Sequence, residues 1–264
     1  MGRAITTEPV QRIVICFSKD GPARFWGHLD LMRNFQRAAR RAGIPLAYSQ
    51  GFNPHPRMTI ASPLPVGASG ERELAAFDLT DEWPVSQAVE GFNRSLPSGV
   101  KVVEAWSVSP EKGTFGSRMF SHWALGVILP DVSVSEAEGA VAAILGEDSL
   151  PVLRRETKTV DIRPGVVSFA LESVDGMEAV LQMHLVQEGD YVVRPAELVQ
   201  LLGDRIGAVQ IVWLRRMNLV PEKFFGPAAS PQTLEPATLD INDAPQASSL
   251  QKDPEREESG EERR

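Results

Sequence analysis

Residues 17–66 read FSKDGPARFWGHLDLMRNFQRAARRAGIPLAYSQGFNPHPRMTIASPLPV, and this stretch decides the fold that we expect. It continues an apolar, β-branched run from Gln11 to Ser18, which is typical of a buried strand. Gly21 and Pro22 supply a turn after that strand. From His28 to Ala42 apolar side chains recur every three or four residues, so an amphipathic helix follows. The chain therefore begins as a mixed α and β protein.

The elements that follow complete a recognisable order. We predict strands over residues 57–61 and 74–80, a helix over 84–95 and a strand over 100–108. Strand, helix, strand, strand, helix, strand is the split βαβ order of a ferredoxin-like domain. The same order recurs as a strand over 122–129, a helix over 133–145, strands over 165–173 and 178–186, a helix over 195–202 and a strand over 208–217.

We therefore predict an α+β protein of two tandem ferredoxin-like (split βαβ) units with a disordered C-terminal tail. Residues 1–110 form the first unit and residues 120–225 the second. Residues 226–264 have few apolar side chains and many Pro, Ser, Asp and Glu, so their burial cannot offset the entropy of ordering. They form the predicted disordered acidic tail.

Composition excludes several classes of protein and of site. No apolar run approaches the roughly 18 to 20 residues that span a membrane, and the N-terminus lacks the apolar core of a signal peptide, so we expect a cytoplasmic protein without a membrane partner. Cys16 is the single cysteine. It excludes a disulfide, a thiolate zinc site and a cysteine-ligated iron-sulfur cluster within the chain. The four histidines lack metal-ligand spacing, so no metal site is predicted.

Charge is distributed unevenly along the chain, whose net charge is −8. Residues 1–60 hold 9 Lys and Arg against 3 Asp and Glu, residues 61–225 hold 14 against 23, and residues 226–264 hold 4 against 9. A local basic surface on an acidic protein favours a phosphate-bearing or acidic partner at one place.

Three side chains near the start of the predicted helix form the first candidate site. Lys19 lies in the turn, His28 begins the helix, and Arg33 follows within about a turn and a half. A neutral imidazole there could act as a general base or donate a hydrogen bond to a phosphate. The alternative is that His28 packs under the helix and bonds Asp30 or the backbone.

The loop Gly51–Arg57 is the second candidate. Asn53 and His55 each precede a proline, which holds both in extended geometry and stiffens the loop. A stiff loop pre-organises His55 for binding, whereas the alternative is a turn closed by Asn53 with His55 idle in solvent. We expect this loop, with Arg57, to meet the residues at the helix start in one pocket.

Two further charged segments have alternative interpretations. Arg37, Arg40 and Arg41 extend the arginine stripe of the helix, which is either a solvated face or a docking face for an acidic partner. Residues 154–164 carry mixed charge before a strand, and form either an anion-binding edge or a charge-guarded edge strand.

The predicted substrate-binding residues are Lys19, His28, Asp30, Arg33, Ser49, Asn53, His55 and Arg57, with Lys158, Asp161 and Arg163 as candidates in the second unit. His28 is also the candidate general base.

These motifs together resemble a known family. FSK-x-G at 17–21, HLDLMR at 28–33, RRAGIP at 40–45, YS-x-GFNPHP at 48–56, PLPVG at 63–67 and VDIRP at 160–164 are similar to the radical SAM-linked proteins, a domain of unknown function (DUF2344). The resemblance covers about residues 12–220. Gly27 stands where the family commonly has Ser, so the helix is predicted to lack a side-chain N-cap.

The resemblance implies an association with a separate radical SAM enzyme. That partner would carry the iron-sulfur cluster and S-adenosylmethionine, and this chain would bind neither. We expect a non-catalytic accessory protein that binds RNA or another phosphate-rich substrate. One alternative is a metal-independent endoribonuclease with His28 as general base, because the layout is similar to CRISPR repeat-processing endoribonucleases. Another is a protein-interaction module that docks an acidic partner on Arg37 and Arg41.

Overall fold

The computed structural model describes residues 8–50, 52–110, 115–155, 157–189 and 191–222. The predicted acidic tail at 226–264 lies outside the described residues. Within them the protein is α+β, with four α-helices and one large mixed sheet. The predicted α+β class is therefore confirmed.

The first half contains four strands, two α-helices and a 3-10 helix. In chain order these are β1 (Gln11–Lys19), the 3-10 helix η1 (Gly21–Phe25), α1 (His28–Ala42), β2 (Met58–Ile60), β3 (Ser69–Leu79), α2 (Val85–Ser95) and β4 (Val100–Val108). The strands lie in the order β4-β1-β3-β2, and all three pairings are antiparallel.

The described part of the second half contains seven strands, two α-helices and a 3-10 helix. Its elements are β5 (Arg118–Ile128), α3 (Val134–Gly146), the hairpin β6 (Pro151–Arg154) and β7 (Lys158–Asp161), the 3-10 helix η2 (Arg163–Gly165), β8 (Val166–Asp175), β9 (Glu178–Glu188), β10 (Tyr191–Val192), α4 (Pro195–Ile206) and β11 (Gln210–Pro221). The strands β8-β9-β5-β11 are antiparallel neighbours, and β10 also pairs with β9.

Most predicted elements are present, and the largest differences are in three strands and in α4, which ends at Ile206 rather than 202. The bounds of α1 and β4 are confirmed. However, β3 begins at Ser69 rather than 74, β5 begins at Arg118 rather than 122, and β11 continues to Pro221 rather than 217. The hairpin of β6 and β7 was not predicted. Each lengthened strand end lies where the two halves meet or where β5 continues beside β11.

Aromatic packing under α1 forms the core of the first half. Phe35 of α1 is fully buried, and its ring lies edge-on to Phe17 with centroids 4.9 Å apart. It meets Phe77 at 5.7 Å and Phe92 at 5.9 Å in the same way. Edge-to-face aromatic pairs stabilise a core beyond the area they bury. They fix α1, and with it the turn before α1, against the sheet.

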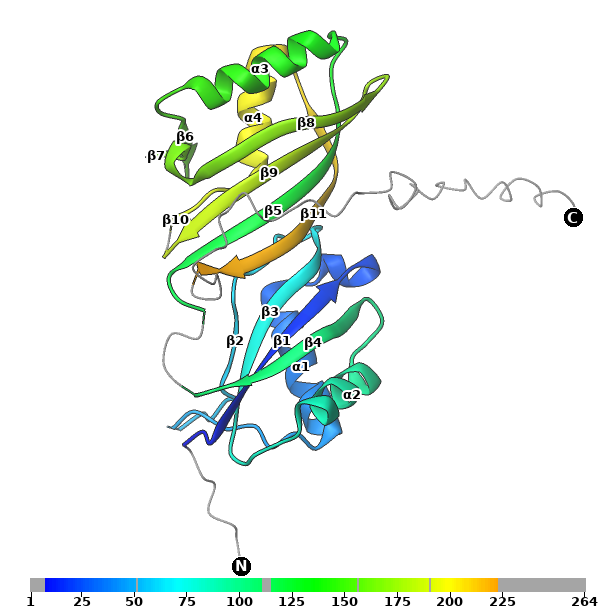
Figure 1. Ribbon diagram of the computed structural model, residues 1–264, viewed down its shortest axis with the longest axis vertical. Coiled ribbons are helices and arrows are strands. Elements are labelled where there is room, and N and C mark those ends of the chain that lie inside the picture. The colour runs from blue at the N-terminus through cyan, green and yellow to red at the C-terminus, as the bar shows by residue number, and fades with distance from the viewer. Residues whose placement is uncertain (1–7, 51, 111–114, 156, 190, 223–264) are drawn as a thin grey trace, which may run out of the picture.

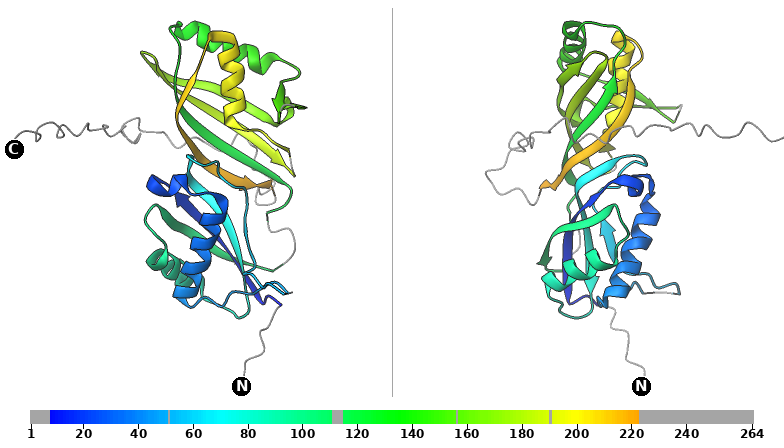
Figure 2. Two further views of the ribbon diagram at one scale, coloured as in Figure 1. Left: turned by 180° about the vertical axis from the view of Figure 1, so that it is seen from behind. Right: turned by 90° about the vertical axis from the view of Figure 1, so that its right-hand side faces the viewer.

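The two halves join through a short parallel pairing of β3 and β11. Arg215 lies opposite Ser69 and Arg216 opposite Gly70, and no other pairs link these two strands among the described residues. Figure 1 shows the halves stacked along the long axis with β11 and β3 at their junction. Seen from behind, α1 and α4 lie in front of the sheet (Figure 2). Side chains must therefore supply much of the contact between the halves.

Candidate functional site

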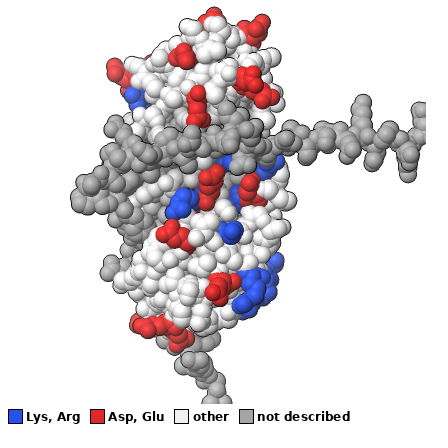
Figure 3. Space-filling model, turned by 45° about the vertical axis from the view of Figure 1, so that its right-hand side comes forward, with Lys and Arg blue, Asp and Glu red and all other residues white. Residues whose placement is uncertain are grey.

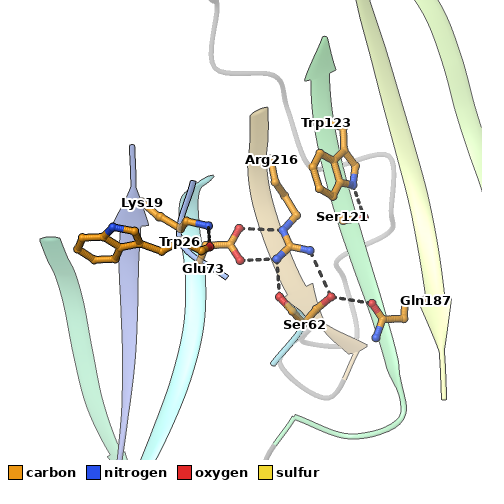
Figure 4. Close-up of polar contacts among 8 residues, drawn as sticks. All are labelled: Lys19, Trp26, Ser62, Glu73, Ser121, Trp123, Gln187 and Arg216. Carbon is orange, nitrogen blue, oxygen red and sulfur yellow. Dashed lines mark hydrogen bonds and ion pairs between the residues drawn. The ribbon is translucent and has the colours of Figure 1, made fainter. Parts of the chain in front are cut away.

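A buried ion pair connects the two halves next to the short pairing of β3 and β11. Glu73 of β3 is only 1% exposed and accepts two hydrogen bonds from Arg216 of β11, one of them from Nε to Oε1 at 2.8 Å (Figure 4). Two parallel bonds from a guanidinium to a carboxylate combine charge with fixed geometry. The pair therefore sets how β11 sits against β3.

Ser62 and Gln187 extend this ion pair to two further segments. Arg216 donates to the backbone oxygen of Ser62 at 2.6 Å and to its Oγ at 3.2 Å. The Ser62 hydroxyl in turn donates to Oε1 of Gln187 on β9 at 2.8 Å (Figure 4). The Arg216 guanidinium also lies 5.1 Å from the centre of the Trp123 ring on β5. Four segments from both halves thus converge on one arginine.

Lys19 lies on the first-half side of the same network. Its ammonium is buried and donates to the backbone oxygen of Trp26 at 3.1 Å (Figure 4). Burial lowers the pKa of Lys19, nearby Glu73 opposes that shift, and Arg216 adds to it. Lys19 therefore stabilises the turn before α1 from inside the protein, and its charge is not presented at the surface.

A groove of about 210 Å³ opens at the surface of this junction. The first half lines it with Arg24, Phe25, Gly67 and Ser69, and the second half with Val212–Arg215 of β11. Along this part of β11 the strand pairs with β5, whereas its pairing with β3 begins only at Arg215. We call it the junction groove.

Two glycines shape the junction groove. Gly67 has φ of 91°, in the left-handed region that favours glycine, and its N–H donates to the Arg24 oxygen at 2.9 Å. Gly126 lies beneath Trp213, where an added Cβ would come within 2.1 Å of the indole nitrogen. The absence of a side chain at Gly126 therefore lets the indole lie close against β5.

Each wall of the groove carries an arginine beside an aromatic ring. The Arg24 guanidinium lies 4.9 Å from the centre of the Phe25 ring, and that of Arg215 lies 5.9 Å from the Trp213 ring. Phe25 is 60% exposed. An exposed aromatic ring next to a guanidinium can stack on a planar group and bind an anion beside it.

Positive charge exceeds negative charge around the groove. Arg215 pairs with Glu71 at 3.3 Å, and Arg216 pairs with Glu73 behind it. Arg24 and Lys19 add two cations, and neither has a carboxylate partner in an ion pair among the described residues. On the face that Figure 3 shows, Lys and Arg side chains near the middle of the molecule lie next to Asp and Glu. The excess at the groove is therefore local.

The predicted residues at the start of α1 flank this region. His28 is the first residue of α1 and half-buried, and its Nδ1 is buried with no hydrogen-bond partner among the described residues. Asp30 and Arg33 are exposed and 3.7 Å apart, which is a weak surface pair. Gly27 is the N-cap and makes no side-chain cap bond, as predicted.

Residues 52–57 of the predicted loop lie at the other end of the first-half sheet. The base of the loop is closed by Ser49, whose N–H donates to the His55 oxygen at 2.9 Å and whose Oγ accepts from the His55 N–H at 3.1 Å. Asn53 and His55 are exposed. Arg57 pairs through Nε with Oδ2 of the buried Asp78 at 3.2 Å.

The structure does not bring this loop together with the helix start. Lys19 lies opposite Gly70, whereas Gln11, at the other end of β1, lies opposite Leu79 next to Asp78. At about 3.3 Å per residue the two ends of β1 are roughly 26 Å apart. The single pocket that we expected is therefore two separate places, because β1 runs the length of the sheet between them.

The candidates in the second half make structural contacts. Oδ1 of Asp161 accepts from the backbone N–H of Leu150 at 2.7 Å and of Arg163 at 3.0 Å, and these bonds lower its pKa. Arg163 donates to the backbone oxygens of Leu145, Glu147 and Val166. Lys158 is exposed. Asp161 and Arg163 thus fasten the β6–β7 hairpin to the end of α3.

Sequence reasoning missed the residues that line the junction groove. Arg24 and Phe25 lie between the predicted turn and the predicted helix and were given no role, and Trp213 and Arg215 were assigned to an ordinary strand. A signal was present in both places, because an arginine stands within two residues of an aromatic side chain. Only the pairing of β3 with β11 shows that the two signals belong together.

Two searches of the described residues were negative. They contain no group of three or more His, Cys, Asp or Glu placed to hold a metal ion. None of their helices combines the length and the apolar character that crossing a bilayer requires.

The family of the chain follows from its sequence. A family model described as an uncharacterized protein conserved in bacteria (DUF2344) matches residues 12–195, which is more than half of the chain. The chain belongs to this family. The match includes η1, α1 and the Gly51–Arg57 loop, but ends before β11. No curated protein matches significantly.

Solved structures resemble this family member only weakly. An archaeal Nop10–Cbf5 complex of the box H/ACA sRNP has 15% identity and a TM-score of 0.45 over 79% of this chain and 48% of that one. A Cbf5–Nop10–Gar1 complex has 13% identity and a TM-score of 0.46 over 78% and 48%. DyPB from Rhodococcus jostii RHA1 has 10% and 0.24 over 83% and 94%. The chain spans about half the length of the first two.

Proposed function

We propose that this protein is a non-catalytic, substrate-binding partner of a separate radical SAM enzyme, and that the junction groove holds RNA or another phosphate-rich substrate. The observation that carries the proposal is the pair of arginine and aromatic side chains on each wall of the groove. Such pairs bind phosphates and planar rings without needing a catalytic group.

The strand orders support a more specific fold. We propose two tandem ferredoxin-like units, because β4-β1-β3-β2 and β11-β5-β9-β8 place equivalent strands in the same order. The groove then lies between the last strand of the second unit and the turn after the first strand of the first unit. Duplication of a small fold creates a binding site that neither copy has alone.

The proposed division of labour leaves the redox chemistry to the enzyme. An iron-sulfur cluster takes several thiolate ligands, and this chain has one cysteine. Cys16 is buried, and burial raises its pKa to about 11, so the thiolate form is disfavoured. The enzyme would supply the cluster and S-adenosylmethionine, and this protein would hold the substrate.

Affinity capture from a native host tests the proposal. The tagged protein should recover a radical SAM protein, nucleic acid or both, and Arg24→Gln should lower the recovered nucleic acid. Arg40→Gln is the matched control, because Arg40 is exposed on α1 and lies outside the groove. Recovery of neither a radical SAM protein nor nucleic acid would overturn the proposal.

A second candidate function rests on His28. His28 is the first residue of α1 and only half-buried, so part of its imidazole is accessible for proton transfer, as an endoribonuclease would need. Incubation with labelled host RNA separates the two functions. Metal-independent cleavage that is lost in His28→Ala favours the enzyme, whereas binding without cleavage favours the accessory role.

A further inference from the structure

We propose that the junction groove takes one unpaired base of a single-stranded RNA, held against Phe25 and Trp213 with the flanking phosphates on Arg24 and Arg215. This inference rests on the proposed function and makes its substrate specific. It distinguishes single-stranded RNA from duplex RNA, from phosphate-rich small molecules and from a docked protein.

The size of the groove limits what can enter. A volume of about 210 Å³ lies below the roughly 300–1,000 Å³ of ordinary small-molecule sites, and the groove is open to the surface. A duplex keeps its bases stacked and paired, so it cannot insert a ring into such a space. One base displaced from a single strand can, with the rest of the strand outside.

Phe25 and Trp213 are placed so that a base can stack on their rings. Phe25 stands on the short 3-10 helix η1 and is 60% exposed at the groove. Trp213 is half-buried because its indole lies against Gly126, which fixes the ring before any ligand binds. One exposed ring and one fixed ring can therefore contact a base without rearranging the sheet.

The charges favour a polyanion over an acidic peptide of low charge density. Arg24 adds a cation at the groove, and Arg215 is only partly neutralised because Glu71 is itself 43% exposed. Lys19 and Arg216 lie behind the groove with Glu73 as the shared carboxylate. Arg24 and Arg215 thus present two guanidinium groups at the groove against the single carboxylate of Glu71, which suits the phosphates of one strand.

The edge of β11 could instead bind a different class of ligand. Gln210–Leu214 pair with β5 on one side, and no described strand pairs with them on the other. An extended peptide could add a strand there. However, a peptide on this edge would depend on backbone hydrogen bonds, so Phe25 and Arg24 would contribute little to its affinity.

Fluorescence anisotropy with two labelled RNAs and one unlabelled competitor tests the proposal on the full-length chain. These are a twelve-nucleotide mixed-sequence RNA, the same RNA annealed to its complement, and inorganic phosphate as competitor. The single strand should bind more tightly than the duplex. Phe25→Leu, which keeps apolar bulk but removes the ring, should weaken single-strand binding about 5- to 150-fold.

Phe52→Leu is the matched control, because Phe52 is fully exposed at the other end of the first-half sheet and should leave affinity unchanged. Arg24→Gln should lower the slope of log affinity against log salt by about 0.7, as expected for one phosphate contact on a single strand. Circular dichroism of each variant confirms that the fold is retained.

Each other outcome overturns the inference in a distinct way. Equal loss in Phe25→Leu and Phe52→Leu, or duplex binding as tight as single-strand binding, excludes base insertion but leaves RNA binding and the proposed function intact. Loss of enzyme capture in Phe25→Leu with unchanged RNA affinity identifies a protein-docking surface. Absence of RNA binding in any form, with the radical SAM protein still captured, excludes RNA and retains the accessory role.

Discussion

Two buried carboxylates of β3 each lie between two cations, but the two networks differ in their exposure to solvent. At one end Glu73 lies between Arg216 and Lys19, and at the other end Asp78 lies between Arg12 and Arg57. Each is a buried carboxylate with two cations from other segments. Around Glu73 both cations are buried, and one comes from the second half of the chain. Around Asp78 both cations come from the first half.

The two networks therefore differ in their access to solvent. The Glu73 network is sealed, so it can hold the halves together but cannot contact a ligand directly. The Asp78 network is partly open, because the Arg57 side chain is 41% exposed and a polar pocket of about 270 Å³ lies beside it. Removing charge should therefore affect stability at one end and local loop structure at the other.

Glu73→Gln should give the largest effect. It leaves Arg216 buried without a counter-charge, so the free energy of unfolding should fall by about 3–5 kcal/mol. Urea unfolding monitored by tryptophan fluorescence measures the change. Glu71→Gln is the control, since Glu71 is exposed and its pair with Arg215 should contribute no more than about 1 kcal/mol. Equal losses would show that the sealed network has no special role.

Asp78→Asn should have an intermediate effect. The amide keeps one acceptor for Arg12, whose Nε lies 2.5 Å from Oδ1, but removes the charge that both arginines share. We expect a loss of about 1–3 kcal/mol in urea unfolding. Faster proteolysis within the Gly51–Arg57 loop should accompany it. A loss as large as that of Glu73→Gln would remove the distinction between the two ends.

Lys19→Met tests the sealed end through pH. Because the pKa of Lys19 is lowered from 10.5 on folding, the folded chain releases that proton at a lower pH than the unfolded chain. The unfolded chain thus binds more protons between the two values, and the stability of the native protein rises with pH in that window. The variant should lack this rise, so the difference in unfolding free energy between native protein and variant should change toward pH 10.5. A constant difference would contradict the assignment.

Arg57→Gln should have the smallest effect. Its side chain is 41% exposed, so the pair with Asp78 should contribute no more than about 1 kcal/mol to unfolding. Arg33→Gln, which breaks an exposed pair with Asp30, provides a comparison of similar exposure. A loss above 2 kcal/mol for Arg57→Gln alone would mean that the loop end is as tightly coupled as the junction.

Local sequence was sufficient for the elements whose own residue pattern marks where they begin and end. Helix α1 was predicted with its bounds because Leu31, Phe35 and Ala38 mark one face and Gly43 ends the helix in the left-handed conformation. The strand β4 was equally clear from its own pattern. Neither element needs a distant residue to explain its bounds.

The junction could not be predicted in the same way. Residues 69–73 read SGERE, a polar sequence that does not look like a strand. They form one because Glu73 and Gly70 pair with Phe17 and Lys19 of β1. The same segment meets β11, where Glu73 bonds to Arg216, 143 positions later. Partners so distant leave no periodic signal. The candidate site was missed for the same reason, since its two walls are separate in sequence.

Because both halves line the groove, binding of a ligand there would be thermodynamically linked to the pairing of the two halves. A ligand that touches Phe25 and Trp213 binds only when the halves are together, so at one hundred times its Kd it would favour the closed form by about 2.7 kcal/mol. The backbone amides of Gly70 and Arg216, paired across the join, would then exchange their hydrogens more slowly when ligand is present. The two-residue pairing of β3 and β11 would thus become more stable when a ligand occupies the groove.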